Sequence, residues 1–132
     1  MAPQTLRAVL DRLRGPARGE PGETLACRYL ERRGLSILAR NFRCRPGEID
    51  IVAREGHVTV FVEVKDRSSA SHGSGVEAVT FGKRRRLVRA ARLYAASRGL
   101  MESALRFDVV SIDRTPDGGT VIRHDRDAFG CD

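Results

Sequence analysis

The chain contains few aromatic residues and few cysteines, which several classes of protein need for their function. None of its 132 residues is tryptophan and only 5% are aromatic, so it lacks a set of rings that could stack on unpaired bases. Its three cysteines, Cys27, Cys44 and Cys131, are too widely spaced for a zinc or redox motif, and their odd number does not suit a disulfide framework. We therefore expect free thiols and a reducing, cytoplasmic setting.

Long apolar runs are also missing. No stretch is long enough for a membrane-spanning helix, and the first 15 residues lack the apolar centre of a signal peptide. The length suits one domain that folds without disulfides. We expect this domain over residues 20–132. Residues 1–19 are predicted to form a helical or mobile extension, because Leu6, Val9 and Leu13 have helical spacing before Gly15-Pro16 interrupts it.

Lysine is scarce although basic residues are not. Of 24 basic residues only Lys65 and Lys83 are lysine, and the net charge is +7 with a sequence pI of about 10.3. This charge favours a polyanionic partner, either nucleic acid or an acidic membrane surface, unless it is an accident of composition. A chain that uses arginine almost everywhere keeps lysine where arginine cannot replace it.

Hydrophobic periodicity predicts an α/β sandwich with a mixed sheet. Apolar residues at helical spacing, each run closed by a glycine, predict helices over 20–33 and 81–98. Alternating or apolar runs predict strands over 35–42, 47–54, 58–65, 105–113 and 119–124, the last at an edge. The serine- and glycine-rich segment 66–80 is predicted to be a loop.

The hairpin over 47–65 carries charge on one face. A two-residue turn at Gly56-His57 places Asp50 opposite Glu63, and a turn one residue earlier leaves the two a diagonal step apart. Lys65 shares the face of Glu63 because side chains two apart on a strand point the same way. A three-residue turn would separate the group unless a bulge restored the register.

Two neighbouring carboxylates stay ionised together only when a cation offsets their repulsion. Oxygen ligands suit a hard divalent ion such as Mg²⁺ or Mn²⁺, which Asp50 and Glu63 are predicted to hold. Lys65 would then orient or deprotonate an attacking water, or stabilise charge on a phosphate. The alternative is a solvated cross-strand charge cluster of little energetic value.

Two further carboxylates are candidates for this site. Glu23 shares a helix face with Ala26 and Leu30, so it either completes the site as a catalytic and metal-binding group or favours the helix dipole. Glu48 is a neighbour of Asp50 and is predicted to support it from outside the ligand set, with pairing to Arg45 or Lys65 as the alternative.

Basic residues near the hairpin are candidates for contact with nucleic acid. Arg67 and Lys83 are predicted to contact phosphates, and the helical stripe Arg85, Arg89 and Arg92 to follow a nucleic-acid backbone. The alternative for the stripe is a solvated helix face. Asp108, within an apolar strand, is predicted to be a structural partner for an arginine. The three histidines, His57, His72 and His124, are assigned no ligand role.

Several motifs together resemble the YraN/UPF0102 family. They are GE-x-x-A-x-x-Y-L at 22–30, RN-x-R at 40–43, GEID at 47–50, FVEVK-x-R at 61–67, Lys83 before a basic helix, and RFDVV at 106–110. This family is similar to the Holliday-junction-resolvase branch of PD-(D/E)xK nucleases. The resemblance implies a restriction-endonuclease-like fold, in which a mixed β-sheet is flanked by α-helices.

The resemblance also implies roles for individual residues. Asp50 takes the motif aspartate, Glu63 the acidic position, Lys65 the lysine, and Glu23 the extra helix carboxylate. Asp66 departs from the pattern, in which a neutral residue more often follows the lysine. Junction resolvases act as dimers, so the resemblance is compatible with a homodimer.

The sequence thus favours a metal-dependent endonuclease that hydrolyses phosphodiester bonds of DNA, with branched DNA as a candidate substrate. One alternative is a non-catalytic DNA-binding module that retains the nuclease fold. Another is a scaffold in a DNA-processing complex. We expect no membrane partner.

Overall fold

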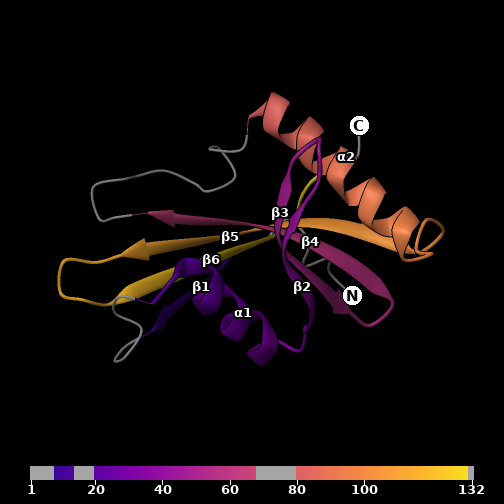
Figure 1. The fold of residues 1–132 in the computed structure, drawn as a ribbon. Helices are drawn as coiled ribbons and strands as arrows, with labels where there is room; N and C mark the ends of the chain where they lie inside the picture. Colours follow the sequence, from indigo (N-terminus) through magenta and orange to yellow (C-terminus); the bar gives the residue numbers. More distant parts are fainter. Residues whose placement is uncertain (1–7, 14–19, 68–79, 131–132) are drawn as a thin grey trace.

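The structure, a computed structural model, describes residues 8–13, 20–67 and 80–130. The elements are β1 (Ala8–Leu13), α1 (Gly22–Arg32), β2 (Ser36–Arg43), β3 (Glu48–Glu55), β4 (Val58–Arg67), α2 (Phe81–Ser97), β5 (Ala104–Arg114) and β6 (Thr120–Phe129) (Figure 1). The strands form one six-stranded sheet in the order β1-β6-β5-β4-β3-β2. Because β4 and β5 pair in parallel and the other neighbours antiparallel, the sheet is mixed, as predicted.

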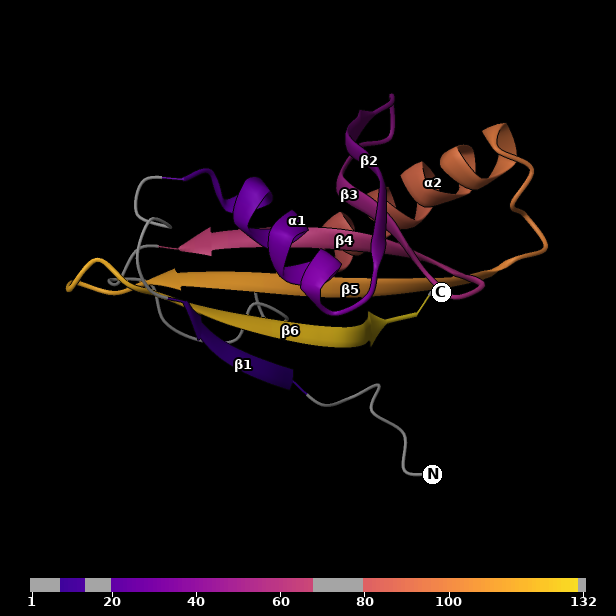
Figure 2. The same cartoon turned by 90° about the horizontal axis from the view of Figure 1, so that it is seen from below.

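The two helices cover opposite faces of this sheet (Figures 1 and 2). Along β4, Val60 and Val62 pack into the core beneath α1, whereas Phe61 packs into the core beneath α2. This follows from the alternation of side chains in an extended strand. The central strands are therefore buried on both faces, and the α/β architecture agrees with a restriction-endonuclease-like fold.

Both helices begin and end close to their predicted bounds. After α1, Gly34 adopts a φ of +91°, which glycine tolerates because it has no Cβ. At the start of α2, the Thr80 hydroxyl accepts a hydrogen bond from the backbone N–H of Lys83 at 3.2 Å. This cap fixes Lys83 in the first turn of α2.

The structure differs from the predictions at both ends of the chain. Ala8–Leu13 forms strand β1, paired with β6, where leucine spacing had suggested a helix or a mobile arm. Strand β6 runs to Phe129 and lies between β5 and β1, so it is not an edge strand. A segment as short as this fits the hydrophobic period of a helix as well as that of a strand. Its pairing with the open side of β6 depends on distant residues and cannot be seen in the local sequence. The boundary between extension and domain stays a prediction.

Some predictions lie partly or wholly outside the described residues. The predicted loop over 66–80 begins later, since β4 continues to Arg67, and residues 68–79, which include His72, are not described. Cys131 is likewise outside. Cys27 is buried and Cys44 half-buried, and both are free thiols, as expected.

The β3–β4 hairpin closes through Gly56-His57, the first of the two predicted turns, and Ile51 pairs with Val62. Pairing between the two strands ends there. Beyond this point β3 pairs only with β2, through contacts such as Phe42 with Ile49. Figure 2 shows this end of the β2–β3 hairpin turning away from β4. The sheet is therefore split between β3 and β4, and Asp50 lies at the start of the split.

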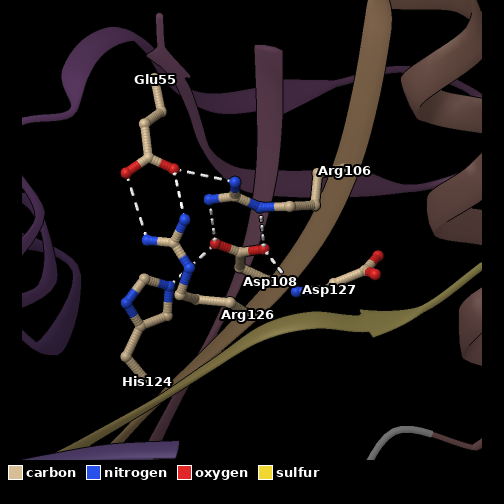
Figure 3. A network of polar contacts seen from close by, with 6 residues as sticks. All are labelled: Glu55, Arg106, Asp108, His124, Arg126 and Asp127. Atoms are coloured by element: carbon tan, nitrogen blue, oxygen red, sulfur yellow. Dashed lines mark hydrogen bonds and ion pairs between the residues drawn. The ribbon is translucent and has the colours of Figure 1, made fainter. Parts of the chain in front are cut away.

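A network of charged side chains lies on the α1 face of the sheet, with Asp108 and His124 buried within it (Figure 3). Asp108, which is fully buried, accepts hydrogen bonds from the Arg106 guanidinium at 2.9 and 3.0 Å, so its predicted arginine partner is confirmed. His124, considered isolated from the sequence, has its Nε2 2.8 Å from an Asp108 carboxylate oxygen. Pairing of β5 with β6 brings these residues together, although they are distant in the sequence.

The same network reaches β3 through Glu55. Its carboxylate contacts the guanidinium groups of Arg106 and Arg126, each at 2.8 Å. The backbone N–H of Asp127, which has a φ of +53°, donates to Asp108 at 2.9 Å. The network thus links β3, β5 and β6 at the end of β3 away from Asp50.

Candidate active site

Asp50, Glu63 and Lys65 meet at the split between β3 and β4. One oxygen of Asp50 accepts a hydrogen bond from the backbone N–H of Val64 at 2.8 Å, so the side chain occupies a position where the backbone of β3 would otherwise pair. The Lys65 ammonium lies 3.3 Å from a carboxylate oxygen of Glu63. Glu63 is buried, and Lys65 and Asp50 are half-buried. The structure therefore brings the three hairpin residues together in a partly desolvated place.

Helix α1 adds Glu23 to this group. Carboxylate oxygens of Glu23, Glu48 and Asp50 lie within 4.8 Å of one another. Glu23 is also in the first turn of α1, where a negative charge favours the helix dipole, so its position is compatible with either explanation offered by the sequence. Helix α1 begins at Gly22, directly before Glu23.

Glu48 occupies a more central place than its predicted supporting role. It belongs to the same three-carboxylate group, and its other contact is with Arg43 at 3.3 Å instead of Arg45 or Lys65. This pairing with Arg43 is exposed to solvent and costs little to exchange for another cation. Glu48 is thus available as a ligand.

Lys83 reaches the site from α2. Its ammonium contacts the same oxygen of Glu63 that Lys65 approaches, so two lysines share one buried carboxylate. The sequence had assigned Lys83 to phosphate contact, and the structure gives it a second partner inside the site. The only two lysines of the chain are therefore both here.

The carboxylate pair carries unequal charge. Burial, and then the negative charge of Glu63, raise the pKa of Asp50 from 3.8 to about 7. Burial acts in the same direction on Glu63, but its contacts with Lys83, Asp50 and Lys65 outweigh it and lower the pKa of Glu63. Without a further cation, Asp50 is therefore partly protonated near neutral pH, whereas Glu63 is ionised.

The pKa values of the two lysines are shifted in opposite directions. Burial, and then the neighbouring Lys83 ammonium, lower the pKa of Lys65 despite the attraction of Glu63. For Lys83 burial opposes protonation, but the hydrogen bond to Glu63 prevails and raises its pKa. Lys65 is therefore the lysine that releases its proton more easily.

A pocket of about 280 Å³ opens beside these groups. It is lined by Gly47, Glu48, Asp50, Glu63, Lys83, Arg86 and Leu87. The sequence analysis missed Arg86, although its spacing of three from Lys83 places both on one side of a helix. The predicted stripe of Arg85, Arg89 and Arg92 is exposed along α2, and none of these three lines the pocket.

Two charged residues that follow Lys65 have other partners. The Arg67 guanidinium is 3.0 Å from Asp113 on β5, so the predicted phosphate contact competes with an ion pair. Asp66, the departure from the family pattern, is held by both guanidinium nitrogens of Arg114 at 2.9 Å. Its charge is thereby balanced outside the carboxylate group.

The donor set suits a hard divalent cation. Glu23, Glu48 and Asp50 offer oxygens only, and burial together with the charge of Glu63 keeps Asp50 partly protonated. A cation among these oxygens would relieve the repulsion that raises the pKa of Asp50. The residues present therefore fit Mg²⁺ or Mn²⁺. Glu63, the other predicted ligand, lies beside Asp50 and contacts both lysines.

In the described residues, no helix is long and apolar enough to cross a membrane. The family described as "Uncharacterised protein family UPF0102" matches residues 22–112, which include every acidic residue and lysine of the site. A UPF0102 protein of Nocardia farcinica is 47% identical over 86% of this chain and 89% of its own length. One from Parafrankia sp. is 48% identical over 84% and 94%, and one from Symbiobacterium thermophilum has the same identity and coverage.

Proposed function

The chain belongs to the UPF0102 family, and for this member we propose a metal-dependent endonuclease that hydrolyses phosphodiester bonds of DNA. One observation carries the proposal. Asp50 and Glu63 lie together at the split in the sheet with Glu23, Glu48 and two lysines around them, and burial and mutual repulsion hold a proton on Asp50. A solvated charge cluster would need neither the burial nor the gathering of four elements.

Asp50, Glu23 and Glu48 would hold the metal, Mg²⁺ or Mn²⁺, with Glu63 beside them. When bound, it would polarise a phosphodiester and lower the pKa of a water molecule. The side chain of Asp50 must lose its proton for this, whereas Glu63 is kept ionised by the lysines. The backbone N–H of Val64 holds Asp50 in place.

Lys65 acts on the attacking water. Its ammonium is half-buried, and its lowered pKa makes proton transfer easier than for an exposed lysine. Glu63 orients it at 3.3 Å. Arginine would remain protonated in the same position, which explains why an arginine-rich chain keeps a lysine here.

The net charge of +7 supports DNA as the partner, because phosphate neutralisation dominates non-specific affinity for nucleic acid. Branched DNA is proposed on the family resemblance alone. Homodimer formation and a cytoplasmic location belong to the same proposal.

A cleavage assay tests the function. Labelled four-way junctions and duplexes are incubated with excess protein and Mg²⁺ or Mn²⁺, with EDTA as the metal-free reference. The wild type is expected to cut DNA only with metal, and Lys65→Ala to reduce the rate at least a hundredfold. Arg54→Ala, an exposed change at the far end of β3, is the matched control and should cleave like the wild type.

Equal background in the wild type and Lys65→Ala would end the catalytic proposal. Salt-dependent DNA binding without cleavage would favour the non-catalytic binding module, and absence of both would favour a scaffold role.

A further inference from the structure

The pocket beside the carboxylates has two chemically different walls. Glu48, Asp50 and Glu63 form an acidic wall from the hairpin, and α2 contributes Lys83 and Arg86. The Lys83 ammonium contacts Glu63 on the acidic wall. Arg86 has no such contact among the described residues. Within the described part of the chain its guanidinium has no ion pair or hydrogen bond, although three carboxylates line the same pocket.

The position of Arg86 is fixed by packing. The turn between β2 and β3 is closed by hydrogen bonds between Cys44 and Gly47, at 3.0 and 3.2 Å, and lies against α2. A Cβ at Gly47 would be only 3.3 Å from the Arg86 Cβ and 3.5 Å from its carbonyl oxygen. The base of the Arg86 side chain is therefore held at the pocket, while its guanidinium stays exposed.

A guanidinium that lies beside carboxylates without pairing with any of them can bind an anionic ligand. Its planar set of N–H donors matches the paired oxygens of a phosphate better than an ammonium does. A pocket of about 280 Å³ is near the lower end for small ligands and accepts a phosphate group with part of its sugar.

We propose that Arg86 is a phosphate-binding residue that holds a DNA phosphodiester in this pocket, on the side opposite the carboxylates. The inference rests on the proposed nuclease function for the identity of the anion. It separates Arg86 from the exposed stripe of Arg85, Arg89 and Arg92, because only Arg86 shares the pocket with Asp50 and Glu63.

DNA binding as a function of salt tests this role. Affinity for a fluorescent four-way junction and a duplex is measured by anisotropy between low and moderate NaCl, with Ca²⁺ replacing Mg²⁺ to suppress cleavage. Arg86→Ala is expected to weaken binding roughly tenfold. It should also reduce the slope of log affinity against log salt by about 0.9, the value for one lost phosphate contact.

Two further variants separate this role from a general loss of structure. Arg86→Lys keeps the charge, so it should retain the salt slope while recovering only part of the affinity. Arg54→Ala removes an equal charge on exposed β3 and should bind like the wild type. Thermal unfolding of all variants should change little, because the Arg86 guanidinium has no ion pair or hydrogen bond among the described residues.

A cleavage assay on the same proteins in Mg²⁺ distinguishes a failure of the proposed nuclease activity from a failure of the proposed phosphate-binding role of Arg86. A wild type that binds DNA through Arg86 without cutting it would contradict the nuclease and leave the phosphate role intact. Wild-type affinity and salt slope in Arg86→Ala would overturn the phosphate role, whether or not the protein cleaves. A wild type without affinity for DNA would overturn it as well.

Discussion

Among single residues, Asp50 shows most clearly that a side chain of the candidate site can lower the folding stability of the protein. Its pKa is 3.8 in an ordinary environment and about 7 in the fold, so the folded chain binds more protons than the unfolded chain between these values. The contribution of Asp50 to the stability of the metal-free protein therefore falls as pH rises from about 4 to 7, and this loss is complete above 7. Burial and the charge of Glu63 are the cause.

Asp50→Asn should remove this cost. In EDTA at pH 8 we expect the variant to be more stable than the wild type by roughly 1–3 kcal/mol, and at pH 4 to differ little. Urea unfolding at the two pH values measures both quantities, with the exposed Glu102→Gln as the control. A variant that is less stable at pH 8 would show that Asp50 does not suffer repulsion in the fold.

Lys65 and Lys83 give a second prediction, helped by the scarcity of lysine. With only two lysines, ¹³C-labelled side chains give two resonances whose titrations can be assigned by substitution. Because Lys83 lowers the pKa of Lys65, Lys83→Met should move the Lys65 titration to higher pH. An unchanged Lys65 titration would mean that the two ammonium groups are not neighbours.

At the level of elements, the hairpin was predictable and the split was not. Alternation in 47–54 and 58–65 left two turns open, either of which places Asp50 near Glu63, and the structure has the turn through Gly56-His57. The split exists because β3 continues with β2 after leaving β4, and that depends on pairing across the sheet. Arg86 was missed for a related reason, since which side of α2 meets the hairpin depends on the turn at Gly47.

The start of α1 places Glu23, and Gly22 makes that start possible. A Cβ at Gly22 would lie 2.6 Å from an Asp66 oxygen and 2.8 Å from its Cβ, and Arg114 prevents Asp66 from moving. Gly22→Ala is therefore expected to lower stability by about 1–3 kcal/mol and to weaken Mn²⁺ binding by displacing Glu23.

A double-mutant cycle checks this contact. Asp66→Gly removes both the carboxylate and the Cβ that a side chain at Gly22 would meet, so the double variant Gly22→Ala/Asp66→Gly should be more stable than the sum of the single changes implies. Urea unfolding of the four proteins gives the coupling. Additive effects would place the cost of Gly22→Ala elsewhere.

For the molecule as a whole, the network around Asp108 ties β3, β5 and β6 together (Figure 3). Burial would raise the pKa of Asp108, but hydrogen bonds from His124 and Arg106 prevail and lower it. A carboxyl whose pKa is lower in the fold stabilises the protein above its unfolded pKa. That stabilisation is lost as pH falls through the folded pKa.

Asp108→Asn should therefore cost roughly 3 kcal/mol at pH 7, because it leaves the partly buried Arg106 with less compensation. The difference from the wild type should shrink in strong acid. Asp113→Asn is a matched control on the same strand, since its ion pair with Arg67 is partly exposed and worth at most about 1 kcal/mol. Equal costs at pH 7 would show that the network adds no more than a surface pair.

The proposed hydrolysis of DNA depends on a divalent cation bound at the split in the sheet, and calorimetric titration with Mn²⁺ at pH 7.5 tests that directly. The wild type should give a saturable isotherm. Asp50→Ala should abolish it, and Arg54→Ala should leave it unchanged. Because Asp50 must lose its proton, wild-type affinity should weaken below pH 7. No saturable binding by the wild type, or equal binding by Asp50→Ala, would contradict a metal-dependent site.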